Sequence, residues 1–191
     1  LLEAVAVAYG FNPEGGTINY RFSTYDDVSE LSTAIQMTKG FLRPEGSYFF
    51  RAESFFNVAT KAEDYRDFSS GPLMYGGRSL HGQSHGESFL AFFQTFSGRG
   101  LYIMDEPEAA LSPQRQLTLF IQIARMAEAG AQFIIATHSP ILLGIPGAEI
   151  LSFDGGQVHP CEYEETESYQ VTEMFINNRD TLTERLLRDG V

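Results

Sequence analysis

The sequence predicts an α/β fold in which helices flank a mostly parallel sheet. Two apolar runs, residues 101–104 and 133–136, have the length and composition of buried strands, and each ends in polar residues. The segment between them has the apolar spacing of a helix, so the three form a strand–helix–strand unit with parallel strands. The carboxyl ends of both strands then lie on one edge of the sheet, where open α/β sheets bind ligands.

Composition and charge narrow the class of protein. The 191 residues are 43% hydrophobic and 20% charged, as expected of one globular domain with a core. Acidic residues outnumber basic ones by 25 to 13, so nucleic acid is expected as a partner only through regions or partners outside this sequence. A single cysteine, Cys161, and the lack of an apolar run of membrane-spanning length predict a cytoplasmic protein without a membrane segment.

The N-terminal part predicts a helix and a small antiparallel β part. Apolar residues recur at helical spacing up to Gly10, a typical helix stop: Leu1, Leu2, Val5 and Tyr9. Residues 17–23 alternate as a strand does, and residues 31–37 are a weaker strand candidate. After a turn, residues 47–51 look like the returning strand.

The C-terminal part predicts three helices and a hairpin. Residues 84–96 carry phenylalanines on a broad apolar face. Ser112, followed by proline, suits the start of the helix after the first buried strand, and Gly130 suits its end. A last pair of strands turns at the Asp-Gly-Gly of residues 154–156, and a C-terminal helix follows from about residue 168.

Two neighbouring carboxylates follow the first buried strand. Asp105 suits a Mg²⁺ site, usually through water, because a hard cation prefers oxygen ligands. Glu106 suits a general base that polarises an attacking water, a role worth roughly 10²–10⁴-fold in rate. The residues alone leave one alternative open, a pair of solvated charges at a strand end.

Four motifs in order resemble those of the ABC-type ATPases, a class of P-loop NTPases, and in particular the soluble ones related to the RecF and SMC families. Residues 101–107 (Leu-Tyr-Ile-Met-Asp-Glu-Pro) resemble the Walker B motif with its catalytic glutamate, and Ala-Leu-Ser-Pro at 110–113 resembles the loop after it. Ala-Thr-His-Ser at 136–139 resembles the switch strand, and Ser-His-Gly-Glu-Ser at 84–88 has the position of the signature motif. The resemblance implies that residues 1–191 form one ATPase domain of this type.

This resemblance implies ATP and Mg²⁺ as cofactors and assigns chemistry to single residues. Asp105 would hold Mg²⁺ through water, and Glu106 would be the catalytic base. His138 would be a second catalytic residue, in contact with the γ-phosphate. Glu53 lies where the family has its Q-loop, which makes it a second candidate metal ligand, although an exposed or capping glutamate is an equal alternative.

The signature segment implies a partner. Ser84 and Glu87 have the spacing of a capping box, so Glu87 is interpreted as structural. Ser84, Gly86 and Ser112 are the implied nucleotide-binding residues, because a helix N-terminus with small residues suits an anion. In the family this N-terminus faces ATP held by the other subunit, so the implied partner is a second copy in a head-to-tail ATP sandwich.

One motif of the family does not occur in the sequence. A P-loop reads Gly-x-x-x-x-Gly-Lys-Ser/Thr, and neither lysine of the chain, Lys39 or Lys61, follows a glycine. The first six residues resemble the helix that follows the P-loop in relatives. We therefore expect the natural protein to extend upstream with a strand and the P-loop, and this chain alone to be inactive as an ATPase.

Two other functions stay open at this point. A naturally P-loop-less subunit would offer its signature helix in trans to a complete ATPase. A metal-dependent nuclease would use Asp105, Glu106 and Glu108 as ligands, but the sequence has no Asp-x-Asp pair of the kind that topoisomerase-primase sites use.

Overall fold

A computed structural model describes residues 1–18, 30–40, 44–55, 85–96 and 98–189 of the chain. These residues form two compact units, Leu1–Thr137 and His138–Val191. The assignment of residues 1–191 to one ATPase domain stays a prediction. No helix of the described residues combines the length and the apolar character that crossing a membrane requires.

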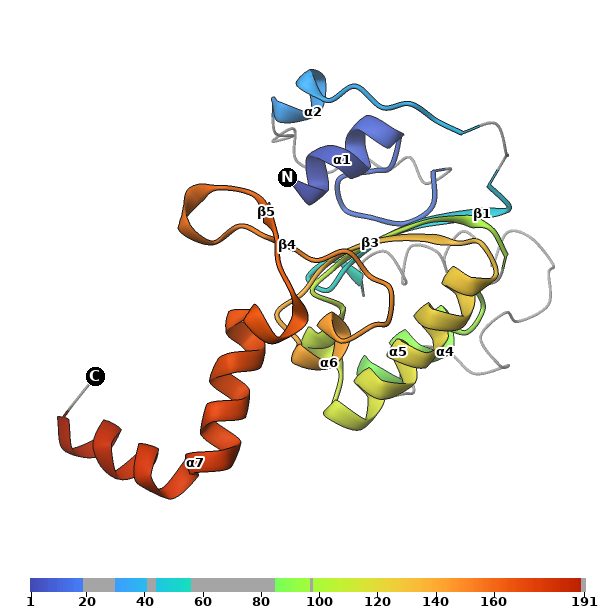
Figure 1. The fold of residues 1–191 in the computed structure, drawn as a ribbon. Helices are drawn as coiled ribbons and strands as arrows, with labels where there is room; N and C mark the ends of the chain where they lie inside the picture. The colour runs from blue at the N-terminus through green and yellow to red at the C-terminus, as the bar shows by residue number, and fades with distance from the viewer. Residues whose placement is uncertain (19–29, 41–43, 56–84, 97, 190–191) are drawn as a thin grey trace. The chain divides into compact units, whose positions relative to one another are not determined.

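A parallel sheet of three strands lies at the centre of the first unit (Figure 1), in the order β1 (Gly46–Arg51), β2 (Gly100–Asp105) and β3 (Gln132–Ala136). Both pairings are parallel, with Arg51 opposite Asp105 and Asp105 opposite Ala136. The last residues of the three strands therefore lie side by side on one edge. This confirms the predicted parallel unit and the predicted edge.

One face of the sheet is covered by α1 (Leu2–Tyr9). Its Ala6 forms a buried cluster with Phe11 and with three sheet residues of this face, Phe49, Leu101 and Ile103. Ile134 is partly buried and packs against this cluster. The helix ends as predicted, because Gly10 has φ 115° and donates its N–H to the carbonyls of the last turn.

The other face is covered by α4 (His85–Phe93) and α5 (Pro113–Glu128), as Figure 1 shows. Successive strand residues point to opposite faces, so this face carries the aromatic neighbours of the residues under α1. Ring centroids lie 4.4 Å apart for Phe50–Phe89, 4.9 Å for Tyr48–Phe92 and 5.2 Å for Tyr102–Phe133. The phenylalanines of α4 thus form the predicted apolar face.

Helix α5 connects β2 to β3 and has the predicted ends. Ser112 is its N-cap with an extended backbone, and Gly130 follows the helix with φ 96°. Leu119, Ile123 and Met126 are buried at helical spacing. The side-chain amide of Gln122 donates a hydrogen bond of 2.7 Å to the carbonyl of Phe93, which joins α5 to α4.

Two predictions for the N-terminal part are wrong. Residues 31–37 contain α2 (Leu31–Ala34), a single helical turn in place of a strand, because Thr33 donates both its N–H and its hydroxyl to the carbonyl of Glu30. Residues 47–51, predicted to return as an antiparallel strand, lie in β1. This strand runs parallel to β2 and is buried at Tyr48, Phe49 and Phe50.

The predicted antiparallel part is therefore reduced, among the described residues, to a single bridge in the N-terminal region. This bridge joins Gly16 to Phe49. Of the segment 17–23, residues 19–23 lie outside the described part of the chain, and Thr17 and Ile18 are not in a strand.

The second unit confirms the predicted hairpin and C-terminal helix. Its strands are β4 (Leu151–Ser152) and β5 (His159–Pro160), paired antiparallel around the short 3-10 helix η3 (Asp154–Gly156). The one-turn helix α6 (Pro140–Leu143) precedes them, with the hydroxyl of Ser139 accepting two N–H groups of its first turn. After η4 (Tyr163–Glu165), α7 (Glu167–Asp189) forms the last described element, with non-helical angles at Asn178.

Candidate functional site

Asp105 and Glu106 lie at the carboxyl edge of the parallel sheet. Asp105 is the last residue of β2, and Glu106 follows it. The N–H of Glu106 donates a 2.9 Å hydrogen bond to the carbonyl of Ala136, the last residue of β3. The backbone of Glu106 thus joins the ends of β2 and β3, and both carboxylates lie at the edge where the sequence predicted them.

The backbone of Glu106 is left-handed, with φ 46° and ψ 53°. It is the one residue other than glycine with a positive φ in the described part of the chain. Pro107 follows it, fully buried, and disfavours the ordinary helical conformation at Glu106. A non-glycine residue in this region costs roughly 1–3 kcal/mol, and such residues cluster at functional sites.

A short segment connects Glu106 to α5. It forms the 3-10 helix η2 (Pro107–Ala110), in which Ala109 donates its N–H to the carbonyl of Glu106 at 3.1 Å. Ser112 is exposed at the start of α5, and within the described part of the chain its hydroxyl makes no capping hydrogen bond to the helix. The hydroxyl of Ser112 is therefore accessible, as a nucleotide contact requires.

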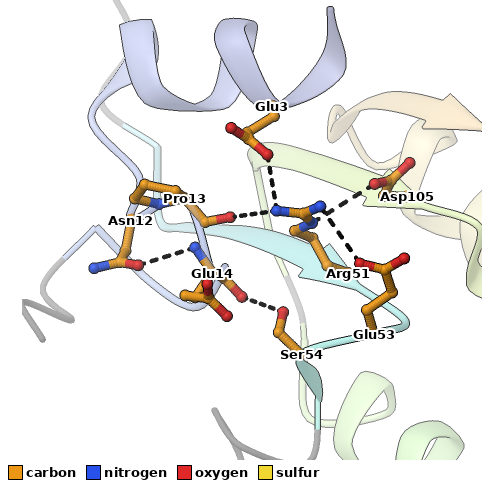
Figure 2. Close-up of polar contacts among 8 residues, drawn as sticks. All are labelled: Glu3, Asn12, Pro13, Glu14, Arg51, Glu53, Ser54 and Asp105. Atoms are coloured by element: carbon orange, nitrogen blue, oxygen red, sulfur yellow. Dashed lines mark hydrogen bonds and ion pairs between the residues drawn. The ribbon is translucent and has the colours of Figure 1, made fainter. Parts of the chain in front are cut away.

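Arg51, the last residue of β1, lies beside Asp105 and is surrounded by carboxylates (Figure 2). Its Nη1 donates to Glu3 Oε2 at 2.8 Å and to the carbonyl of Pro13 at 3.0 Å. Its Nε lies 3.7 Å from Asp105 Oδ2, and its Nη2 lies 3.7 Å from Glu53 Oε2. The structure therefore brings Asp105 and Glu53 to a common cation at the sheet edge.

The charges of this cluster are unbalanced toward the negative. Three carboxylates, those of Glu3, Glu53 and Asp105, share one guanidinium group. Burial raises the pKa of the Asp105 carboxyl above its ordinary value; Arg51 opposes this shift, and Glu53 and Glu3 add to it. An excess of negative charge on oxygen atoms suits a hard cation.

A turn before the bridge at Gly16 supports the far side of Arg51 (Figure 2). The N–H of Glu14 donates to Asn12 Oδ1 at 3.0 Å, and the hydroxyl of Ser54 donates to the carbonyl of Glu14. Gly15 follows with φ 100°, and a Cβ there would lie 2.7 Å from the carbonyl oxygen of Phe49. The Pro13 carbonyl is thereby fixed against the end of β1.

The remaining predicted residues are placed less closely. Ser84 lies outside the described residues, and Gly86 lies in the first turn of α4. His138 follows β3 by two residues and begins the second unit. Glu53 is 87% exposed, so its contact with Arg51 is a surface pair of small energetic weight. The roles of these four residues stay predictions.

Sequence reasoning missed Arg51 and Glu3. They are 48 residues apart in the chain, and each sits in a segment whose pattern indicates only a strand end or a helix start. A signal was present in the charge of Arg51, which ends a strand rich in aromatic residues. This charge can be connected with Asp105 only when β1 is known to run parallel to β2, because the parallel register places Arg51 opposite Asp105.

Within the described part of the chain, no group of three or more His, Cys, Asp or Glu side chains is arranged to hold a metal ion directly. The excess of negatively charged oxygen atoms around Arg51 is compatible with Mg²⁺ at Asp105 and Glu53, and their role as metal ligands stays a prediction.

Part of the chain is similar to a known protein family. A protein-family model described as "AAA domain, putative AbiEii toxin, Type IV TA system" matches residues 83–144, about a third of the chain. The matched range includes β2, α5 and β3, and with them Asp105 and Glu106. It supports a P-loop ATPase-type domain and, in general terms, nucleotide binding. No curated protein and no solved structure matches the chain.

Proposed function

We propose that this chain carries the signature, Walker B and switch motifs of an ABC-type ATPase, which binds and hydrolyses ATP with Mg²⁺. The observation that carries the proposal is Glu106, held in a left-handed conformation directly after Asp105 at the edge of a buried parallel strand. Backbone strain of this kind is retained where it positions a functional group. The match over residues 83–144 supports the same class of domain.

The proposed chemistry divides between two neighbouring carboxylates. Glu106 acts as the general base that accepts a proton from the attacking water. Asp105, with Glu53 as a second candidate, holds Mg²⁺ mainly through water, and the bound ion supplies neutralisation of phosphate charge. Asp105 has the positive charge of Arg51 on one side, so its carboxylate is oriented before a cation arrives.

The proposed nucleotide contacts come from two copies of the chain. Ser84 and Gly86 at the start of α4 would face the γ-phosphate of ATP bound to the other copy, as a helix N-terminus does with anions. Ser112 would contact nucleotide in the loop after β2, and His138 would contact the γ-phosphate. Together these contacts define a head-to-tail dimer with ATP between the copies.

Hydrolysis also requires a P-loop, which the 191 residues do not contain. The proposal therefore requires that the loop comes from elsewhere in the same protein, with a P-loop-less subunit of a complete ATPase as the alternative. Assays of the full-length gene product and of the 191-residue chain, each alone, distinguish the two. Mg²⁺-ATPase activity of the full-length protein supports a P-loop elsewhere in the same protein. A lack of ATPase activity in both proteins supports a P-loop-less subunit.

Glu106→Gln tests the base role in the full-length protein. We expect hydrolysis to fall roughly 10²–10⁴-fold, because the amide cannot accept the proton of water. Glu128→Gln is the matched control, since it changes an exposed glutamate at the end of α5 and leaves the sheet edge intact. Normal turnover in Glu106→Gln would remove this residue from the base role. Cleavage of nucleic acid with Mg²⁺ or Mn²⁺ in the absence of ATP would favour a nuclease instead.

A further inference from the structure

The guanidinium of Arg51 is anchored on one side and unsatisfied on the other. Its Nη1 makes both of its short hydrogen bonds, to Glu3 on α1 and to the Pro13 carbonyl. The side chain is only 21% exposed, and its Nε is buried without a hydrogen-bond partner among the described residues. The anchored side fixes the plane of the group, and the other side faces the sheet edge (Figure 2).

The unsatisfied side faces the two candidate metal residues. Nε is 3.7 Å from Asp105 Oδ2 and Nη2 is 3.7 Å from Glu53 Oε2, both beyond the length of an N–H···O hydrogen bond. A buried donor without a partner is costly, and it is retained where the site needs it. The buried Nε can therefore orient the Asp105 carboxylate by charge and leave its oxygens available to a cation. The Nη2 pair with the exposed Glu53 acts in the same direction but more weakly.

The geometry points to Arg51 as a positioning residue that holds Asp105, and more weakly the exposed Glu53, for a divalent cation and ties them, through Glu3, to helix α1. This inference rests on the proposed function for the identity of the reaction. It adds a residue that no sequence motif marks. The orienting partners of metal-binding side chains typically change metal affinity by about 10–100-fold when they are lost.

A second arginine of the first unit provides a matched comparison. Arg99 precedes β2 at the opposite end of the strand, and its Nε lies 4.0 Å from Glu45 Oε1. Both members of this pair are more than half exposed, and neither lies at the carboxyl edge. Arg99→Gln therefore removes one positive charge and one ion pair without touching Asp105 or Glu53.

The first test measures Mn²⁺ binding to the full-length gene product by electron paramagnetic resonance, with no nucleotide and no turnover. We expect Arg51→Gln to weaken Mn²⁺ binding about tenfold, Arg51→Lys to weaken it less, and Arg99→Gln to leave it unchanged. A purely electrostatic role gives the opposite sign, because removal of a positive charge beside two carboxylates strengthens cation binding. Unchanged or tighter binding in Arg51→Gln would therefore overturn the inference.

Glu3→Gln extends the test to the anchor and leaves Arg51 in place if Arg51→Gln does not fold. We expect Glu3→Gln to weaken Mn²⁺ binding, with no further loss when it is combined with Arg51→Lys, because both act through the same guanidinium position. Fully additive losses would contradict a shared positioning role.

Steady-state kinetics separate this inference from the proposed function. If the wild type hydrolyses ATP, Arg51→Lys should raise the half-saturating Mg²⁺ concentration and keep kcat at saturating Mg²⁺ near the wild-type value. An equal half-saturating Mg²⁺ concentration in the wild type and in Arg51→Lys would contradict the inference about Arg51 without contradicting the ATPase proposal. If the wild type shows no ATPase activity, the Mn²⁺ measurements still decide the role of Arg51.

Discussion

Glu106 combines an unfavourable backbone conformation with a position next to Asp105 at the carboxyl edge of the sheet. Glycine would adopt φ 46° without strain, and the chain nevertheless has a glutamate there. A residue retained at a cost in stability is expected to serve function, because natural proteins place strain at active sites. This trade-off can be measured as a gain in stability when the side chain is lost.

Glu106→Gly is expected to leave the free energy of unfolding unchanged or to raise it by up to about 1 kcal/mol, while abolishing hydrolysis. The gain comes from removing left-handed strain, offset in part by the flexibility of glycine in the unfolded chain. Glu128→Gly, in the last turn of α5, should instead destabilise by about 1 kcal/mol. Urea denaturation of both variants checks this, and equal destabilisation would contradict strain at Glu106.

At the scale of single residues, the sequence predicted those that follow a local pattern. Asp105 and Glu106 were found because an apolar run ends at them, and the structure places both at the edge of the sheet. Arg51 and Glu3 were not found, because their contact joins a strand end to a helix 48 residues away. Such pairs depend on the strand order, which no local pattern contains.

At the scale of elements, the start of the β1–β2 pair depends on two glycines. Gly46 and Gly100 are register partners, and a Cβ built on Gly100 would lie 1.6 Å from the carbonyl oxygen of Gly46. No side chain fits this gap, so the two strands approach each other only because position 100 lacks a Cβ. The register of the pair in turn sets Arg51 opposite Asp105 at the other end.

Gly100→Ala is therefore expected to lower the free energy of unfolding by about 3 kcal/mol, because the strands must separate to admit the methyl group. Gly40→Ala is the matched control, since nothing lies within 4 Å of the position of its Cβ and its φ is not left-handed. That variant should be neutral or slightly stabilised. Thermal unfolding of both proteins checks the prediction, and a neutral Gly100→Ala would contradict the close approach.

Elements with two independent signals were predicted well, and elements with one signal were not. Helix α5 had a cap, a proline and a glycine stop, and β2 had an apolar run with polar residues after it. Residues 31–37 had only apolar character, and a local hydrogen bond from Thr33 to Glu30 accompanies a helical turn at residues 31–34 instead. The direction of β1 depends on its partner strand, which a turn signal before it did not reveal.

At the scale of the whole molecule, the proposed function requires a second copy. Gly86 lies in the first turn of α4, and the phenylalanines that follow it in this helix are buried against the sheet. In a head-to-tail pair this helix start would contribute Ser84 and Gly86 to ATP bound by the other copy. Dimerisation should then depend on ATP and should persist only while ATP is intact.

The full-length Glu106→Gln variant is therefore expected to double in mass when ATP and Mg²⁺ are added, and to remain monomeric with ADP. Slow hydrolysis preserves the γ-phosphate that both copies contact, whereas the wild type would revert as ATP is consumed. Ser84→Arg in the same background should bind ATP and stay monomeric, because a bulky cation replaces the small residue at the proposed interface. Light scattering after size-exclusion chromatography measures the masses. An ATP-bound Glu106→Gln monomer would contradict the sandwich, and an ATP-dependent dimer that tolerates Ser84→Arg would place the interface elsewhere.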